Sequence, residues 1–336
     1  METKRLNREQ ADIAGAILRN GGLVAIPTET VYGLAADAYN GDAVARIFAA
    51  KGRPMDNPLI VHISKLSQLE ELVAYVPSAL YDLADAFWPG PLTIILPKSE
   101  RIPDEVSAGL DTVAVRMPSH PVARAVIDAA GTPLAAPSAN TSGKPSPTTA
   151  EHVRDDLDGR IDAIVDGGPC EVGVESTVLT LCGRVPRILR PGRVTPDDLS
   201  EVLGEVEVDD AVLGQLKEGQ VAASPGMKYK HYSPNAEVYI VRGPIDRFAD
   251  FVNAQDPDST LALVFTGEED AVHCRTLPFG EKDDELAHAV YLFDDLRRAD
   301  DLGVKNVYVR CPSYDGVGLA VMNRLLRAAE FRFIDV

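Results

Sequence analysis

Two cations, Lys51 and Arg53, stand just past the expected end of a helix, beside a glycine and a proline. Such residues are poor choices for a hydrophobic core and good ones for binding an anion, because they combine positive charge with several hydrogen-bond donors. In isolation, the pair could equally complement the negative end of the helix dipole. A polar loop with Thr28, Glu29 and Thr30 precedes them and adds hydroxyl and carboxylate groups.

The polar residues lie between two short apolar runs that are expected to position them. Leu23–Ile26 and Leu59–Ile63 have the length and composition of buried strands. Between them, a helix is expected from Asp42 to Ala50, because apolar residues recur on one face and Asp42 can serve as its N-cap. The two cations would then lie between the end of this helix and the second strand.

Eight short motifs, most of them polar, follow one another along the chain. They are PTETVYGL from Pro27, KGRPMDNPLIVH from Lys51, WPGPLT from Trp88, GLDTVAVRMPSHP from Gly109, APSANTSGKPSPT from Ala136, GVESTV from Gly173, LRPG from Leu189 and SPGMKYKHYSP from Ser224. Together these motifs resemble the YrdC-like superfamily and, within it, the L-threonylcarbamoyl-AMP synthases in their two-domain form. The resemblance covers nearly the whole chain, which makes it far more specific than a single glycine-rich pattern.

The resemblance implies a reaction. It would combine L-threonine, bicarbonate and ATP into L-threonylcarbamoyl-AMP and pyrophosphate, for the N6-threonylcarbamoyladenosine modification of tRNA. The threonine amine is first carboxylated, and the carbamate oxygen then attacks the α-phosphorus of ATP. Neither step requires a protein nucleophile, so the site has to orient two unstable partners and neutralise negative charge. The sequence fits this requirement, since it shows cations and hydroxyls but no evident Ser-His-Asp, Cys-His or paired-carboxylate arrangement.

The resemblance also assigns residues to the amino-acid substrate. Arg116 would pair with the threonine carboxylate, because a planar guanidinium matches a carboxylate with two hydrogen bonds; the structural alternative is an internal ion pair. Thr30, His62, Ser176 and the carbonyl of Ala136 would surround the amine and the hydroxyl. Hydrogen bonds to that hydroxyl would exclude valine, which leaves buried polar groups unpaired. Outside its motif, His62 would more often be a core histidine with its hydrogen bonds satisfied.

For ATP, the resemblance matches a longer set of polar residues: Arg53, Asn57, Thr112, Ser138, Asn140, Ser146, Arg190, Tyr229 and His231. Lys51 and Arg53 are the expected catalytic residues, with Lys51 near the phosphates or the bicarbonate. Ser138, Ala139 and Asn140 lie in a loop after a buried strand, where exposed N–H groups can bind phosphate. Structural alternatives remain open, namely a helix cap for Ser138 and a local hydroxyl turn for Ser146.

Mg²⁺ is the one expected cofactor, and it would arrive bound to the ATP phosphates. The sequence shows no dedicated cage of carboxylates, so no metal site of the protein itself is predicted. Glu29 and Glu175 could contact the ion through water. A Walker A loop is absent, because Gly143-Lys144 is followed by a proline, and ATP must therefore be held in another way.

Strands and helices alternate along the chain in two series. In the first, helices are predicted at 8–19, 67–74, 78–87, 121–130 and 194–203, and strands at 92–96, 112–117, 134–136, 161–165 and 177–181. In the second, strands are predicted at 238–241, 261–265 and 304–309, and helices at 245–253, 284–299 and 318–329. We therefore expect an α/β protein with a YrdC-like catalytic domain over 1–204, built on a twisted mixed sheet, and a smaller Rossmann-like open α/β domain over 236–336.

Residues 205–235 are expected to form an ordered linker that folds over the active site. The motif SPGMKYKHYSP brings cations and aromatic rings into a very acidic chain, whereas a plain tether would be rich in glycine and serine or charged throughout. We expect Tyr229 or His231 to reach ATP, with the C-terminal domain acting as an anchor or lid.

The composition is ordinary for a globular protein except in its charge. The chain has 336 residues, 45% of them hydrophobic and 25% charged, which allows two domains with cores of their own. The net charge of −18 argues against a broad basic surface for nucleic acid, and it is equally compatible with a surface adapted for solubility or high salt. Four scattered cysteines suggest neither a zinc site nor a disulfide framework. Without a signal-peptide pattern or a long apolar run, we expect a cytoplasmic protein with no membrane contact.

Two alternatives to the synthase remain. One is an RNA-binding module, because YrdC-like domains have been proposed to bind double-stranded RNA on a concave positive surface. The other is a carbamoyl-handling maturation enzyme like the YrdC-like part of HypF, which would bring acylphosphatase and zinc-finger segments that the sequence does not show. The synthase interpretation implies a separate threonylcarbamoyl transferase as downstream partner. Contact with tRNA would then be indirect, and direct contact stays open.

Overall fold

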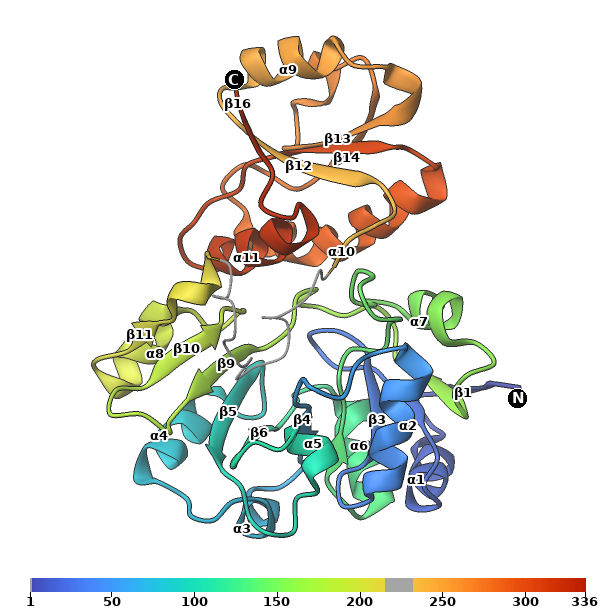
Figure 1. Ribbon diagram of the computed structural model, residues 1–336, viewed down its shortest axis with the longest axis vertical. Helices are drawn as coiled ribbons and strands as arrows, with labels where there is room; N and C mark the ends of the chain where they lie inside the picture. Colours follow the sequence, from blue (N-terminus) through green and yellow to red (C-terminus); the bar gives the residue numbers. More distant parts are fainter. Residues whose placement is uncertain (1, 215–231) are drawn as a thin grey trace. The chain divides into compact units, whose positions relative to one another are not determined.

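A computed structural model of the chain describes residues 2–214 and 232–336, which divide into two compact units (Figure 1). Unit 1 holds the described residues up to Ser142 and from Ser146 onward to residue 214. Unit 2 holds the described residues from Tyr232 to Val336, together with the short segment Gly143–Pro145. No helix in the described ranges is long and apolar enough to cross a membrane.

Unit 1 is built on one mixed sheet of eleven strands. In chain order these are β1 (Lys4–Asn7), β2 (Val24–Ile26), β3 (Gly33–Asp37), β4 (Ile60–His62), β5 (Leu92–Pro97), β6 (Thr112–Arg116), β7 (Leu134–Ala135), β8 (Ala163–Asp166), β9 (Thr177–Thr180), β10 (Arg187–Arg190) and β11 (Glu207–Val208). Their order across the sheet is β1-β8-β2-β3-β7-β4-β6-β5-β9-β10-β11. Parallel pairs such as β4/β6 and β5/β9 alternate with antiparallel pairs such as β5/β6 and β9/β10, which confirms the predicted mixed sheet.

The helices of unit 1 include the predicted series, several with shifted ends, and two further helices, at 104–107 and 150–157, that were not predicted. In chain order, the helices are α1 (Ala11–Arg19), α2 (Gly41–Lys51), α3 (Leu69–Leu72), α4 (Ser78–Phe87), α5 (Asp104–Ser107), α6 (Pro121–Ala130), α7 (Ala150–Leu157) and α8 (Pro196–Leu203), and a 3₁₀ turn, η1 (Leu66–Gln68), precedes α3. The bounds of α4 and α6 are the predicted ones. The predicted start of the first helix is wrong, since α1 begins at Ala11. The helix predicted over 67–74 is the η1 turn followed by α3, which ends at Leu72.

The N-cap of α2 is Asn40, so the prediction of Asp42 is wrong. The Asn40 side chain accepts a hydrogen bond from the backbone N–H of Ala43 at 3.1 Å, while Asp42 lies inside the first turn. The helix ends at Gly52, whose φ of 62° is the left-handed conformation that glycine adopts without strain. This turn places Lys51 at the end of the helix and Arg53 just beyond it.

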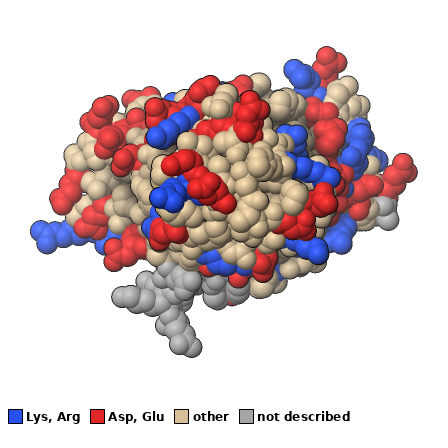
Figure 2. Space-filling view, turned by 90° about the horizontal axis from the view of Figure 1, so that it is seen from above, with Lys and Arg blue, Asp and Glu red and all other residues tan. Residues whose placement is uncertain are grey.

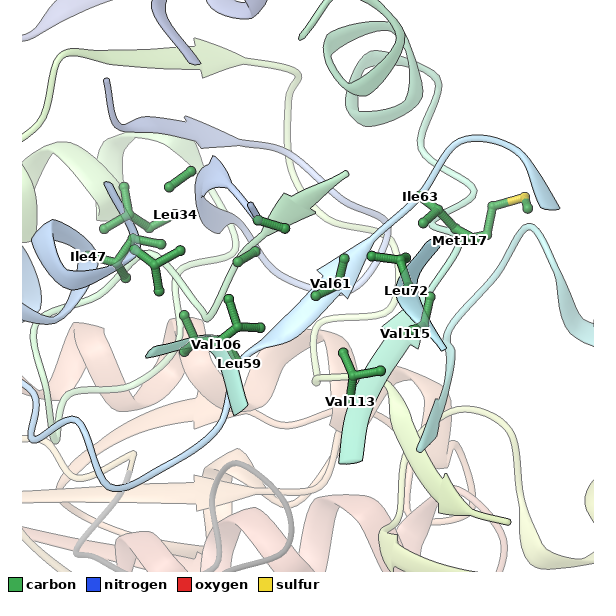
Figure 3. Packing of buried hydrophobic residues seen from close by; sticks show 14 of the residues in the cluster. Leu34, Ile47, Leu59, Val61, Ile63, Leu72, Val106, Val113, Val115 and Met117 are labelled. Atoms are coloured by element: carbon green, nitrogen blue, oxygen red, sulfur yellow. The ribbon is translucent and has the colours of Figure 1, made fainter. Parts of the chain in front are cut away.

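Two apolar layers cover the sheet of unit 1. One includes Leu34, Ile47, Leu59, Val61, Ile63, Leu72, Val106, Val113, Val115 and Met117, which pack together between the central strands and the helices beside them (Figure 3). Helices α1 and α6 pack with β2, β7 and β8 in a second cluster. Because side chains alternate along a strand, Ile60 and Ala114 point to the face opposite that of Val61 and Val115.

That opposite face carries a smaller apolar cluster: Ile60, Ile95, Ala114, Val178, Leu189 and Ala211. We call the first five of these residues the sheet patch. Ala211 comes from a 3₁₀ turn, η2 (Asp210–Val212), at the start of the expected linker. The first part of the expected linker, residues 205–214, thus contains β11 and η2, and its residues 215–231 lie outside the described residues.

Unit 2 is a five-stranded open sheet in which all strands are parallel. It contains β12 (Glu237–Arg242), β13 (Thr260–Val264), β14 (Arg275–Pro278), β15 (Asn306–Arg310) and β16 (Phe333–Asp335), in the order β14-β13-β15-β12-β16. The connecting segments include α9 (Ile245–Asn253), α10 (Glu285–Leu302) and α11 (Gly318–Ala328), with short 3₁₀ turns η3 (Pro257–Ser259) and η4 (Glu269–Ala271). This confirms the predicted open α/β arrangement; the edge strands β14 and β16 were not predicted.

Replacing Asn40 by alanine should lower the free energy of unfolding of unit 1 by about 1 kcal/mol, because the cap satisfies a backbone N–H that no helical carbonyl can reach. Asp42→Ala is the control, since Asp42 offers only its charge to the first turn and should cost about 0.3 kcal/mol. Urea unfolding of the two variants beside the parent measures both. A loss in Asp42→Ala equal to or larger than that in Asn40→Ala would contradict the assignment of the cap.

Candidate active site

Polar residues of neighbouring strands meet in one row across the sheet of unit 1. His62 of β4 is paired with Arg116 of β6, and Arg116 is paired with Thr93 of β5. Thr93 is paired with Val178 of β9, which in turn is paired with Arg190 of β10. Directly opposed residues place their side chains on the same face of a sheet, so this row shares the face of the sheet patch. All of its polar members are buried.

The guanidinium of Arg116 is the centre of a hydrogen-bond cluster. Its Nη2 donates to Oε1 of Glu29 at 2.6 Å and its Nη1 donates to Oγ1 of Thr30 at 2.9 Å. Its Nε donates to the carbonyl of Gly90 at 3.3 Å. Three of its five N–H donors therefore have partners within the described ranges, and one donor remains on each terminal nitrogen. Two donors on one guanidinium can bind a carboxylate.

Glu29 is the counter-ion of Arg116. Burial alone would raise the pKa of Glu29, but the charge of Arg116 and the hydrogen bonds to Arg116 and to the Ser119 backbone outweigh it and hold the pKa below its ordinary value. The N–H of Ser119 donates to the second carboxylate oxygen at 3.2 Å. Glu29 is thus ionised, and the structural alternative for Arg116, an internal ion pair, is present. The two unused donors show that this pairing leaves Arg116 able to bind a ligand as well.

Among the predicted site residues, two buried side chains carry polar atoms that have no hydrogen-bond partner within the described ranges. They are Nδ1 of His62 and both amide atoms of Asn57, a residue that is only 1% exposed. Burial, reinforced by the nearby charge of Arg116, lowers the pKa of His62 to about 3, so its ring is neutral at physiological pH. Each unpaired buried polar group costs about 1–3 kcal/mol. Such groups are rare in folded proteins and indicate a place where a ligand supplies the partner.

Ser176 is held by Arg190 and by Thr93. Arg190 donates from Nε to the Ser176 carbonyl and from Nη2 to its Oγ, both at 3.1 Å. The hydroxyls of Ser176 and Thr93 are 2.8 Å apart. Arg190 therefore lies beside the residue predicted to contact threonine. Thr93 was not predicted as a site residue, although it is the last residue of the WPGPLT motif.

Lys51 lies beneath the loop of Ser138 and Asn140. Its ammonium group donates to the Ser138 carbonyl, to the Asn140 carbonyl at 2.6 Å and to the Asn140 side-chain oxygen at 3.3 Å. The carbonyl of Lys51 in turn accepts from the N–H of Ser142 at 2.8 Å. Lys51 is only 3% exposed, and its ammonium group holds the backbone of this loop in place. Its role is therefore more than to complement the helix dipole.

The same loop offers fewer free N–H groups than expected. The N–H of Ala139 donates to the Tyr32 carbonyl, and that of Thr141 donates to a carboxylate oxygen of Asp156. With the bond from Ser142 described above, three of its N–H groups are already used. Of the three residues named in the prediction that exposed N–H groups bind phosphate, Ala139 therefore has its N–H already used; for Ser138 and Asn140 it stays a prediction.

The alternatives left open for two serines are settled by the structure. Ser138 caps no helix, because the next helix, α7, has Thr149 as its N-cap. Ser146 makes no local turn through its hydroxyl; it donates to the Glu175 carboxylate at 2.5 Å, and both side chains are buried.

The remaining predicted residues lie as follows. Ala136 is tied to β4 by a hydrogen bond from its N–H to the Ile60 carbonyl at 2.9 Å. Arg53 donates to the Asn57 carbonyl at 3.2 Å. Thr112 is the first residue of β6, on the same face as Arg116. Tyr229 and His231 lie outside the described residues. Within the described ranges, no group of three or more His, Cys, Asp or Glu side chains could hold a metal ion.

Lowering the pH from 7 to 5 should destabilise the protein through His62. The unfolded chain binds a proton near pH 6.5, whereas the buried ring does not until about pH 3. The stability that the neutral ring contributes is fully present above pH 6.5, the pKa of histidine in the unfolded chain. It falls as the pH falls, so the free energy of unfolding should be about 2 kcal/mol lower at pH 5. Urea unfolding at both pH values should show a smaller loss in His62→Gln than in the parent. His273→Gln, at an exposed position, is the control; an unchanged loss in His62→Gln would refute the assignment.

The chain matches family models over nearly all of its length. The Sua5/YciO/YrdC model, described as telomere recombination, matches residues 16–192, and the model of the threonylcarbamoyl-AMP synthase C-terminal domain matches residues 194–330. Threonylcarbamoyl-AMP synthase of Pyrococcus abyssi is 46% identical over 338 residues, covering 99% of this chain and 98% of the relative. The enzyme of that name from Bacillus subtilis is 47% identical, covering 98% and 95%.

A solved structure is similar over the whole chain. The crystal structure of P. abyssi Sua5 complexed with L-threonine has a TM-score of 0.93 and 43% identity, and the match covers 100% of both chains. Both the sequence relatives and this structure include the C-terminal domain. The chain therefore belongs to the threonylcarbamoyl-AMP synthase family.

Proposed function

We propose that this protein is a nucleotidyltransferase that converts L-threonine, bicarbonate and ATP into L-threonylcarbamoyl-AMP and pyrophosphate. The observation that carries the proposal is the buried Arg116, which keeps one donor unused on each terminal nitrogen, beside the neutral ring of His62. A small amino acid meets both needs, because its carboxylate can take the two donors and its amine can use the histidine nitrogen. Family membership identifies that amino acid as L-threonine.

The part of the site that would bind the amino acid is lined by polar groups. Arg116 would bind the carboxylate, and Thr30 and Ser176 would offer hydroxyls to the substrate hydroxyl and amine, with the Ala136 carbonyl as a further acceptor. The hydroxyl of Thr30 is oriented by a second hydroxyl, that of Thr28, at 2.9 Å. These groups are ordered before the substrate arrives, so little orientational freedom is lost on binding.

The nucleotide would extend from this end along the sheet. Thr112 lies four positions before Arg116 on the same face of β6, a separation of about 13 Å along a strand. Ala114, a member of the sheet patch, lies between them on β6. A ligand that reaches from Arg116 to Thr112 must be elongated, as an acyl adenylate is. We accordingly assign Arg53, Asn57, Thr112, Ser138, Asn140, Ser146 and Arg190 to ATP.

In the chemical step, the carbamate oxygen of the substrate attacks the α-phosphorus, and pyrophosphate leaves. No protein nucleophile is required, so the contribution of the chain is to align the two partners and to offset the charge of the phosphates. Arg53 and Arg190 would stabilise that charge directly. Mg²⁺ would be carried by the ATP phosphates, since the nearby carboxylates of Glu29 and Glu175 already accept hydrogen bonds from Arg116 and Ser146.

The product is a mixed anhydride, which is an activated donor of the threonylcarbamoyl group and needs an acceptor. We propose that a separate threonylcarbamoyl transferase takes it to tRNA in the cytoplasm, so that tRNA contact with this chain is indirect. No observation favours the RNA-binding alternative. Acidic side chains are interspersed among basic ones on the face shown in Figure 2, in keeping with the net charge of −18.

Pyrophosphate release from ATP should require both L-threonine and bicarbonate. Serine should support slower release, because it keeps the hydroxyl and loses only the methyl group. Valine should support almost none, because it leaves the hydroxyl partners unpaired. A coupled assay of pyrophosphate with each amino acid, with and without bicarbonate, measures this. Release that is indifferent to threonine would sink the proposed function.

Replacing Arg116 by lysine should raise the KM for L-threonine by about 10- to 100-fold, because an ammonium group has only three donors and cannot bind a carboxylate with two of them while it also holds Glu29 and Thr30. The KM for ATP should change less than twofold. Arg187→Lys is the matched control on the same sheet, since Arg187 pairs with Glu207 and is about half exposed. Thermal unfolding confirms that the variants are folded. Equal changes in both KM values would place Arg116 elsewhere than at the amino acid.

A further inference from the structure

Thr93 is the one buried polar member of the row across the sheet to which neither the sequence nor the proposed function gives a role. It lies on β5 between Arg116 of β6 and Val178 of β9, and its side chain is fully buried. Its hydroxyl lies 2.8 Å from the hydroxyl of Ser176, within hydrogen-bond distance. A buried hydroxyl in a strand that only needed packing could be a valine, so the position of this group calls for a function.

The hydrogen atoms of the two hydroxyls can be counted. Oγ of Ser176 accepts one hydrogen bond from Nη2 of Arg190. If Thr93 donates to Ser176 as well, the serine oxygen has two donors, and its own hydrogen is directed to the remaining position. If Ser176 donates to Thr93 instead, the serine has no hydrogen left to give. Only the first arrangement leaves Ser176 able to donate to an amino-acid substrate.

We propose that Thr93 is a positioning residue for the amino-acid site: its hydroxyl donates to Ser176 and thereby fixes the direction in which the Ser176 hydroxyl donates. This inference rests on the proposed function, because it takes Ser176 as a contact of L-threonine. The serine oxygen accepts hydrogen bonds from Arg190 and Thr93, and its own hydrogen is donated to the substrate. Thr93 itself does not touch the substrate.

The proposal separates Thr93 from a residue that only fills space. Thr93→Val keeps the branched shape and leaves Ser176 bonded to Arg190, so unit 1 should fold normally. The Ser176 hydroxyl would then rotate, because one of the two groups that fix it is gone. Thr93→Ser keeps the hydroxyl and loses a methyl group. A role in packing predicts that serine is the worse replacement, whereas a role in positioning predicts that valine is.

The test measures KM values for L-threonine and ATP in the pyrophosphate assay of the full chain. Thr93→Val should raise the KM for L-threonine by about 3- to 10-fold, the effect of one net hydrogen bond, and change the KM for ATP less than twofold. Thr93→Ser should stay within about twofold of the parent for both substrates. Thr132→Val is the matched control, since it removes a hydroxyl-to-side-chain hydrogen bond, at 2.8 Å to Asp37, elsewhere in unit 1.

A double-mutant cycle shows whether Thr93 acts through Ser176. On the background of Ser176→Ala, Thr93→Val should have no further effect on the KM for L-threonine, because there is no hydroxyl left to position. An equal effect on both backgrounds would overturn the proposal, as would an unchanged KM in Thr93→Val. If the parent protein itself showed no threonine-dependent release, the proposed function would fail first, and that outcome is distinct from either of these.

Discussion

The buried ion pair between Arg116 and Glu29 is the interaction on which the site depends. Both side chains are almost fully removed from water, and such a charge is tolerated only when its partner is close. Removing either residue would leave the other charged in a poorly solvated position, at a cost of about 3–5 kcal/mol. The pair also has a consequence for binding. Because Glu29, Thr30 and Gly90 hold the guanidinium on three donors, the direction of the two remaining donors is set before any ligand arrives.

The strand register extends this order across the sheet. Pairing of β4, β6, β5, β9 and β10 aligns His62, Arg116, Thr93 and Arg190 on one face, although these residues are scattered over much of the sequence. A shift of one residue in any pairing would turn the polar side chain of that strand to the other face. The apolar layer on that other face opposes such a shift, because it would expose residues such as Val61 and Val115. Core packing and site geometry therefore depend on the same register.

Much of the fold could be predicted from the sequence where the local signals were strong. Helices α4, α6 and α9 have the predicted bounds, because each follows or begins with a proline and repeats apolar residues with helical spacing. Strand β3, Gly33–Asp37, could not be recognised, since its glycine and alanines have no strand preference and only its burial in the sheet makes it a strand. Asn40 is the N-cap of α2 because its side chain reaches the N–H of Ala43. The sequence offers both Asn40 and Asp42 as capping residues, and only the backbone geometry decides between them.

The candidate site shows the same limit. The residue types came from the motifs, and family resemblance supplied their roles. The pairing of Arg116 with Glu29 joins two positions 87 residues apart, so the sequence alone could only leave an ion pair open as an alternative. The Lys51 contacts with the Ser138 and Asn140 carbonyls were likewise not visible, because they depend on how a distant loop folds over the end of α2. Thr93 was missed because a threonine in a buried strand looks like any other strand residue.

The most direct test of the account is to follow the carbon of bicarbonate into the product. The full chain would be incubated with ATP, L-threonine and ¹³C-labelled bicarbonate, and the nucleotides would be analysed at once by mass spectrometry. The account predicts an adenylate that contains threonine and one ¹³C atom, formed only when all three substrates are present. An adenylate without the label, or the absence of any threonine-containing adenylate from a folded protein, would contradict it.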